Sequence, residues 1–143
     1  TDRYLGYVKS LIEHGIRPKE EYLIPDRDVN SGLRDDYGSY RFPEKMPTAF
    51  VCNCDFIAGL VIKALQERGL RVPEDVSVVG YDNYLYPGLC DVGITTYEVD
   101  VKEMAKGAIN TLIKKMNGEP YKHGIHIVEG HLVEKESVSI NSR

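Results

Sequence analysis

Residues 47–60 read PTAFVCNCDFIAGL, and this segment combines a short apolar strand with the beginning of a helix. Residues 49–54 are mostly apolar, which suits a buried strand of ordinary length. From 57 to 65 the apolar side chains recur every three or four residues, the spacing that places them on one helical face, and Gly69 follows as a C-cap. The segment therefore predicts a strand, a sharp turn and a helix.

Two further segments continue this alternation toward the C-terminus. Residues 76–81 read VSVVGY, a β-branched run typical of a parallel strand that is buried on both faces. A strand at 94–97 and a helix at 100–116 follow, and Asn117 with Gly118 closes that helix. Because strands alternate with helices, we predict an α/β fold with an open, mostly parallel sheet and helices on both faces.

The remaining segments carry weaker patterns. Apolar residues spaced three and four apart predict a helix over 2–14, and Pro25 stops a short apolar strand at 21–24. Residues 33–41 predict a short helix and residues 124–133 a last strand. A chain of 143 residues has room for one domain of average size, so we predict a single domain.

Composition narrows the class of protein. The chain is 42% apolar and 28% charged, and no apolar run approaches the roughly 20 residues that a membrane span needs, so we expect a water-soluble protein without membrane contact. The net charge of −4 and the scattered Lys and Arg residues argue against DNA binding by this segment alone. Three cysteines, an odd number, argue against a disulfide framework and favour the reducing cytoplasm.

Patterns for catalysis and metal binding are weak. Cys52 and Cys54 suggest a metal site, but no second ligand pair stands at a fitting spacing, so buried thiols are the favoured interpretation. The four histidines have no partner at a useful spacing, and the phosphate-loop pattern is absent. We therefore predict no metal, no cofactor and no enzymatic activity.

A longer pattern surrounds the central strand and helix. It covers residues 47–59, residues 64–83, which include VPEDVSVVGYDN, and the two threonines at 95–96. This pattern resembles the C-terminal subdomain of the LacI/GalR family of transcription regulators. Residues 3–7 (RYLGY) and residues 132–138 (LVEKESV) are similar to further parts of that family, so the resemblance covers nearly the whole chain.

The resemblance implies a sensing function. Residues 1–143 would form part of an effector-binding domain: the C-terminal subdomain of the type I periplasmic-binding-protein-like fold, plus the helix that normally packs on an N-terminal subdomain missing here. A homodimer would bind a small effector (a sugar, a sugar phosphate or a similar metabolite) between the two subdomains. Hinge motion would then control operator binding through a DNA-binding domain that this chain lacks.

One alternative shares the same fold. A periplasmic sugar-binding protein of a transport system has this architecture as well. The three cysteines and the signature at 72–82 favour the regulator. A helix-turn-helix encoded upstream would decide for the regulator, and a signal peptide there would decide for the transport protein.

Open α/β sheets bind ligands beyond the carboxyl ends of their strands, where Asp26 with Arg27, Asp55, and Asp82 with Asn83 are expected to lie. Asp55 is the first candidate, because its carboxylate would accept hydrogen bonds from ligand hydroxyls; the alternative is that it caps its own helix. Arg3 stands where the family uses an arginine whose guanidinium donates to two ligand oxygens. The alternative is that Arg3 forms a surface salt bridge. Asp82 belongs to a turn whose Asp more often organises the loop than touches the ligand.

Two positions depart from the family pattern. Arg27 falls near where the family often stacks an aromatic ring on the ligand, and together with Arg3 it would favour an anionic effector. A surface arginine is the alternative. Cys54 replaces the usual Asn, which weakens the expectation of typical sugar coordination.

The resemblance also implies contacts between subunits. The helix after the central strand is similar to one that the family uses in its dimer interface, so we expect Phe56, Leu60 and Lys63 to face a second subunit. The helix at 100–116 would lack its usual partner, and we predict that the chain self-associates through its apolar face. That face consists of Val101, Met104, Ala108 and Leu112.

Overall fold

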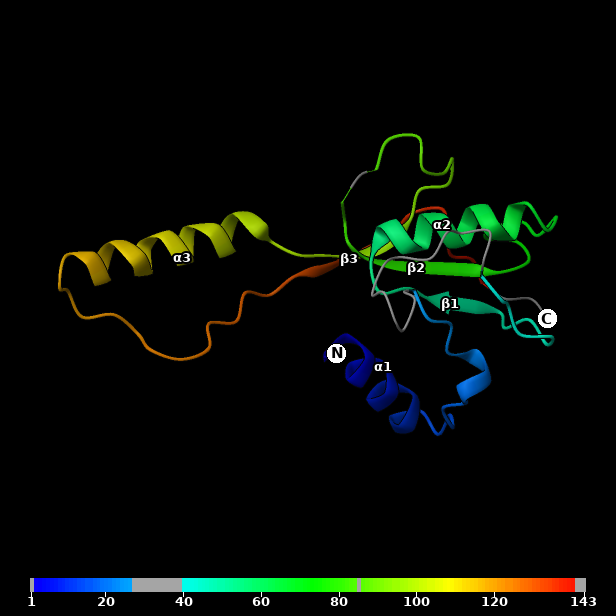
Figure 1. The fold of residues 1–143 in the computed structure, drawn as a ribbon, viewed down its shortest axis with the longest axis horizontal. Helices are drawn as coiled ribbons and strands as arrows, with labels where there is room; N and C mark the ends of the chain where they lie inside the picture. Colours follow the sequence, from blue (N-terminus) through cyan, green and yellow to red (C-terminus); the bar gives the residue numbers. More distant parts are fainter. Residues whose placement is uncertain (1, 27–39, 85, 141–143) are drawn as a thin grey trace.

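The sheet lies at the centre of the computed structural model, which describes residues 2–26, 40–84 and 86–140 (Figure 1). Its strands are β1 (Ala49–Val51), β2 (Ser77–Asp82), β3 (Thr95–Glu98) and β4 (His131–Val133), in that spatial order. β1, β2 and β3 run parallel, and β4 pairs antiparallel with β3. The predicted α/β class and the mostly parallel sheet are therefore confirmed.

Helix α2 (Asp55–Gln66) packs against β2 and supplies most of the core. Ile62 and Leu65 are completely buried, and so is Val78 in the middle of β2. Each buried side chain of this size contributes about 1.5–3 kcal/mol relative to an exposed one. The helix ends near Gly69, whose φ of +76° is a conformation that favours glycine. This strand–helix–strand unit is the part of the fold that the sequence pattern predicts best.

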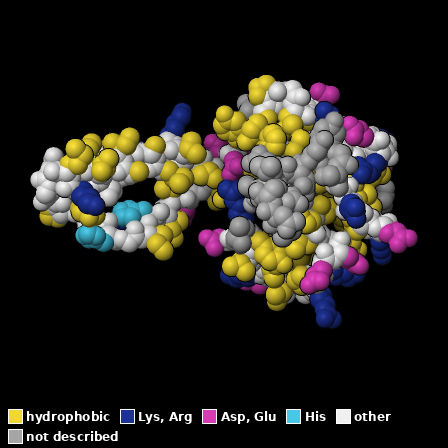
Figure 2. All heavy atoms as spheres, viewed as in Figure 1, with side chains coloured by type: hydrophobic (Ala, Val, Ile, Leu, Met, Phe, Trp, Pro, Cys, Tyr) yellow, Lys and Arg dark blue, Asp and Glu magenta, His cyan; other side chains and the backbone are white. Residues whose placement is uncertain are grey.

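Helix α3 (Val101–Met116) projects away from the body (Figure 1). The Asp100 side chain accepts a hydrogen bond from the Glu103 amide and caps its first turn. We call residues 99–130, which contain α3 and the segment that returns to β4, the arm. No residue of α3 is buried, and Figure 2 shows its apolar side chains along the outside of the arm. α3 covers neither face of the sheet, so the helices on its two faces are α2 and α1 (Asp2–Glu13).

Helix α1 (Asp2–Glu13) and a 3-10 helix, η1 (Glu20–Tyr22), form the N-terminal part. In Figure 1, β1 and β2 lie between α1 and α2. No residue of α1 is buried, so its connection to the sheet depends on polar contacts that begin with Arg3.

Three weaker expectations have different outcomes. The strand expected at 21–24 is wrong, since η1 occupies its first two residues and residues 23–24 form no strand. The last strand is shorter than expected, because residues 124–130 pair with no strand in the described part of the chain, and Ile125 and Ile127 are 88% and 84% exposed. The helix expected at 33–41 lies almost wholly outside the described residues. Within the described segments, no helix has the length and apolarity needed to cross a membrane.

Candidate functional site

The carboxyl ends of the three parallel strands meet at one edge of the sheet. Asp55 follows β1, Asp82 ends β2 and Glu98 ends β3. The register pairs Asp82 with Glu98 directly across β2 and β3. This edge therefore gathers acidic side chains at the place where open α/β sheets bind ligands.

Arg3 connects α1 to this edge. Its Nη1 donates to the Asn53 carbonyl at 2.6 Å, and its Nη2 donates to Asp82 Oδ1 at 3.0 Å. The guanidinium carbon lies 3.9 Å from the centre of the Tyr81 ring, which in turn stacks on Tyr97 at 5.5 Å. The Arg3 and Asp82 side chains remain 42% and 34% exposed. The structure thus brings two predicted ligand contacts together as an open, charged pair.

Asp82 and Asn83 form a turn with unusual backbone geometry. Their φ angles are +104° and +51°, both in the region that non-glycine residues rarely adopt. The Asn83 amide donates from Nδ2 to Glu98 Oε2 at 2.7 Å, and its Oδ1 accepts from Lys135 Nζ at 2.7 Å. The turn therefore depends on side-chain contacts from β3 and from the segment after β4.

Asp55 lies beneath this turn, and it is 3% exposed. Its Oδ2 accepts a hydrogen bond from the Tyr84 amide at 3.0 Å, whereas Oδ1 has no partner of ordinary geometry among the described residues. The N-cap of α2 is Cys54, which makes no side-chain cap bond, so the alternative that Asp55 caps its helix is not what the structure shows. Asp55 instead holds the backbone that follows the Asp82 turn.

The ionisation of Asp55 reflects this burial. Burial raises the pKa of Asp55, and the contacts with Thr96, Tyr84 and Lys135 oppose that rise. The charge of Asp82 adds to it. A carboxylate that is buried in this way is better placed to hold protein backbone than to meet a ligand arriving from solvent.

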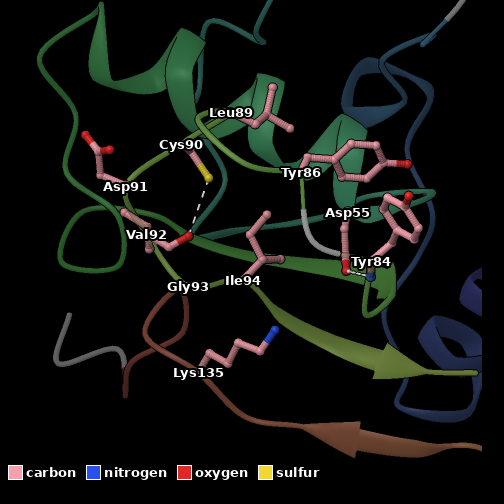
Figure 3. Close-up of a pocket in the computed structure, with 10 residues that line it drawn as sticks. All are labelled: Asp55, Tyr84, Tyr86, Leu89, Cys90, Asp91, Val92, Gly93, Ile94 and Lys135. Carbon is pink, nitrogen blue, oxygen red and sulfur yellow. Dashed lines mark hydrogen bonds between the residues drawn. The ribbon is translucent and has the colours of Figure 1, made fainter.

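A hollow of about 310 Å³ opens beside Asp55 (Figure 3). Tyr84, Tyr86 and Leu89 line one part of it, and Ile94 and Lys135 line another. Its volume is at the lower limit of the roughly 300–1,000 Å³ typical of ligand pockets. Sequence reasoning missed these residues, because nothing in the local pattern places Lys135 beside Asn83, 52 positions earlier.

The other predicted site residues fall in different places. Arg27 lies outside the described residues. Phe56 is half-buried, and the centre of its ring lies 5.1 Å from the centre of the Tyr86 ring in an edge-to-face arrangement, while Lys63 is exposed. Leu60 is only 8% exposed and packs within the core, so it offers little surface to a second subunit. Phe56 and Lys63 are what remains of the expected interface.

The three cysteines are free thiols. Burial is the main cause that raises the pKa of Cys52 to about 12, with the nearby charges of Cys54 and Asp55 adding to the rise. A thiol with so high a pKa is a poor nucleophile and a poor metal ligand, because the thiolate is the reactive form. Among the described residues, no three His, Cys, Asp or Glu side chains group as metal ligands do.

Comparison with known proteins defines the class. The family model of the periplasmic binding protein-like domain matches residues 1–138, so the chain belongs to this family. Within it, the chain is similar to the HTH-type transcriptional repressor PurR of Pectobacterium carotovorum subsp. carotovorum, with 32% identity over 142 residues. That match covers 97% of this chain and 41% of the repressor.

Solved structures agree with this result. A LacI-type transcription regulator from Bifidobacterium animalis subsp. lactis superposes with a TM-score of 0.76 at 27% identity, covering 96% of this chain and 50% of the regulator. The lac repressor dimer bound to operator and the anti-inducer ONPF matches at 29% identity and a TM-score of 0.58, covering 64% of this chain and 32% of that one. These relatives are regulators rather than enzymes, in agreement with the sequence prediction. The chain spans about two fifths of the length of the curated relative.

Proposed function

We propose that this chain is the effector-sensing part of a LacI-type transcription regulator and that a small polar molecule binds beside Arg3 and Asp82. The observation that carries the proposal is the pair itself. A guanidinium and a carboxylate from elements 79 residues apart meet at 3.0 Å, both partly open to solvent, at the carboxyl edge of a parallel sheet. That edge is where this class of sheet takes its ligands.

The chemistry of the pair suits a hydroxylated ligand. The guanidinium of Arg3 can fork onto two ligand oxygens, and the carboxylate of Asp82 can accept from hydroxyls. Tyr81 adds an aromatic face beside them. Because an exposed ion pair is worth only about 0–1 kcal/mol, a ligand can replace the contacts between Arg3 and Asp82 at little cost. A sugar, a sugar phosphate or a related metabolite fits this set of groups.

The whole protein would transmit binding to DNA. A change in closure around the effector would shift a dimer between two states, with a coupling of about 1–3 kcal/mol between effector and operator. The relatives support this proposal, since one is an HTH-type repressor and another is a dimer bound to operator. The exposed Lys63 and the half-buried Phe56 are the residues of α2 that would face a second subunit. Such a regulator works inside the cell.

A binding protein of a transport system is the second candidate, because the family model is that of periplasmic binding protein-like domains. The names of the relatives favour the regulator. Reading the gene upstream of residue 1 discriminates the two. A helix-turn-helix supports the regulator, and a signal peptide supports the transport protein.

A thermal-shift screen against sugars, sugar phosphates and purines tests the site. A compound at 100 times its dissociation constant adds roughly 2.7 kcal/mol, which raises the melting temperature by several degrees. We expect Arg3→Met and Asp82→Asn to lose that rise. Arg71→Met is the matched control, because Arg71 makes a similar 3.0 Å ion pair with Asp75 before the amino end of β2, away from the carboxyl ends of the strands. Equal responses in all three variants would refute the site.

A further inference from the structure

We infer that Asn83 is a positioning residue for the effector site: Glu98 and Lys135 clamp its side-chain amide, and the clamp turns Asp82 toward Arg3. The inference rests on the proposed function, since it explains how the Arg3–Asp82 pair is held ready. Asn83 itself is not assigned a ligand contact. Its role is to act through the residue before it.

The backbone shows why such a clamp is needed. The φ of Asp82, +104°, lies well beyond the left-handed minimum near +57°, and Asn83 at +51° is close to that minimum. Conformations of this kind cost on the order of 1–3 kcal/mol per residue and persist only where the surroundings hold them. Asn is one of the few residues that enter the left-handed region readily, so Asn83 suits the turn. A φ of +104° is unfavourable for Asp82, so contacts from neighbouring residues must stabilise it.

Three hydrogen bonds to Asn83 provide this support. Nδ2 donates to Glu98 Oε2 and Oδ1 accepts from Lys135 Nζ, both at 2.7 Å, while the backbone amide donates to Thr96 Oγ1 at 3.3 Å. The two charged partners fix the amide in one orientation. If the amide flipped, its oxygen would face the Glu98 carboxylate and its NH₂ group would face the Lys135 ammonium. Partial burial strengthens both charge-assisted bonds.

The charges also explain why an amide suits this position better than a carboxylate. An Asp would keep the bond from Lys135 but would set a second negative charge against Glu98. Only a side chain with a donor at one end and an acceptor at the other satisfies both neighbours. Asn83 is therefore matched to the pair of charges around it.

The clamp joins the turn to the arm. Glu98 is the last residue of β3, which leads to α3, and Lys135 lies two residues after β4, which returns from it. Figure 1 shows the arm leaving the body through these two strands. Through Asn83, the turn that presents Asp82 is thus bonded to both connections of the arm. A shift of the arm would change the direction of Asp82, and a ligand on Asp82 would favour one position of the arm.

Nuclear magnetic resonance of the full chain tests the clamp without any effector. Two signals report on the site: the upfield ring-current shift of the Arg3 side-chain protons over Tyr81, and the strong amide-to-Hα contact within Asp82 that marks its positive φ. Asn83→Gly removes the clamp while tolerating positive φ, so backbone strain at that position cannot explain a loss. Lys135→Met removes one arm of the clamp and leaves the turn sequence intact. Asn117→Gly, which removes an amide bonded to Glu119 in the arm, is the matched control.

We expect Asn83→Gly and Lys135→Met to lose both signals and Asn117→Gly to keep them. Retention of both signals in either clamp variant would overturn the inference. The result is separate from the ligand screen, because neither signal requires a bound molecule. A failed screen would overturn the proposed function without affecting the clamp. Intact signals in the clamp variants would overturn the clamp without affecting the proposed function.

Discussion

Helices α2 and α3 carry similar apolar stripes, but the two stripes differ in burial. α2 buries nine residues, among them Ile57, Ile62 and Leu65, whereas α3 buries none. The apolar periodicity of a helix therefore predicts which face is apolar. It does not predict which other surface will cover that face. α2 packs against β2. α3 follows β3 into the arm, where its apolar stripe is exposed to solvent. The body of the molecule and its arm should accordingly respond very differently to the same substitution.

Removing matched isoleucines from the two helices should give the largest contrast. Ile62 in α2 is completely buried, and Ile113 in α3 is 49% exposed. Ile62→Ala should cost about 2–5 kcal/mol of unfolding free energy through lost burial and the cavity left behind. Ile113→Ala should change it by no more than about 0.5 kcal/mol. Urea denaturation of both variants measures the difference, and equal losses would show that α3 is packed in solution.

Self-association through the arm remains a prediction, and charge substitution tests it. The face of Val101, Met104, Ala108 and Leu112 is exposed in the single chain, so a second copy is expected to cover it. Burying a Leu or Met contributes about 1.5–3 kcal/mol, so Leu112→Glu should weaken association at least about tenfold. Sedimentation equilibrium measures this. A wild-type chain that stays monomeric at high concentration would contradict the prediction.

Replacing Asp55 should affect the body by an intermediate amount. Asp55→Ala removes the acceptor for the Tyr84 amide and should cost about 1–3 kcal/mol. Asp55→Asn keeps an acceptor and removes a buried charge, so it should cost little. A direct charge contact with the effector predicts a different pattern, in which both variants lose ligand binding alike.

The pH dependence of stability checks the same residue. Burial raises the pKa of Asp55 above its ordinary value of 3.8, so the folded chain holds this proton more tightly than the unfolded chain does. The contribution of Asp55 to the unfolding free energy should therefore fall as pH rises from 3.8 through the raised pKa. Asp55→Asn should lack that fall. An identical pH profile in the variant and the wild type would show that the carboxyl is not buried as described.

The smallest expected effect lies at the start of the arm. Asp100 caps α3 through its bond to the Glu103 amide, and its replacement by alanine should destabilise the first turn by about 1 kcal/mol. Since α3 buries nothing, the loss should stay local. Hydrogen exchange should speed up in α3 and remain unchanged in α2. Faster exchange in both helices would mean that arm and body unfold together.

The same contrast explains what the sequence could predict. The β1–α2–β2 unit could be predicted because α2 and the inward-facing residues of its two strands pack on one another, and both carry clear apolar patterns. Residues 124–130 show how this reasoning fails: the apolar side chains suggest a strand, but they pair with no strand among the described residues. Leu60 fails for another reason, since a wide apolar stripe does not reveal which side is core and which is surface.

The site was predictable only in part. The positions after β1 and β2 follow from topology, which made Asp55 and Asp82 candidates. Their ranking did not follow, because burial of Asp55 under the turn depends on how the chain folds back at Tyr84. The clamp on Asn83 could not be predicted from the sequence, since Lys135 lies 52 residues away and no local pattern connects the two.

The most direct test of the central claim is to map where an effector binds. Amide chemical shifts would be recorded for the labelled chain with and without the best compound from the screen. We expect the largest changes at Arg3, Tyr81 and Asp82, with smaller ones along the clamp to Glu98. Changes centred on the hollow at 89–94, with Arg3 and Asp82 unaffected, would contradict it.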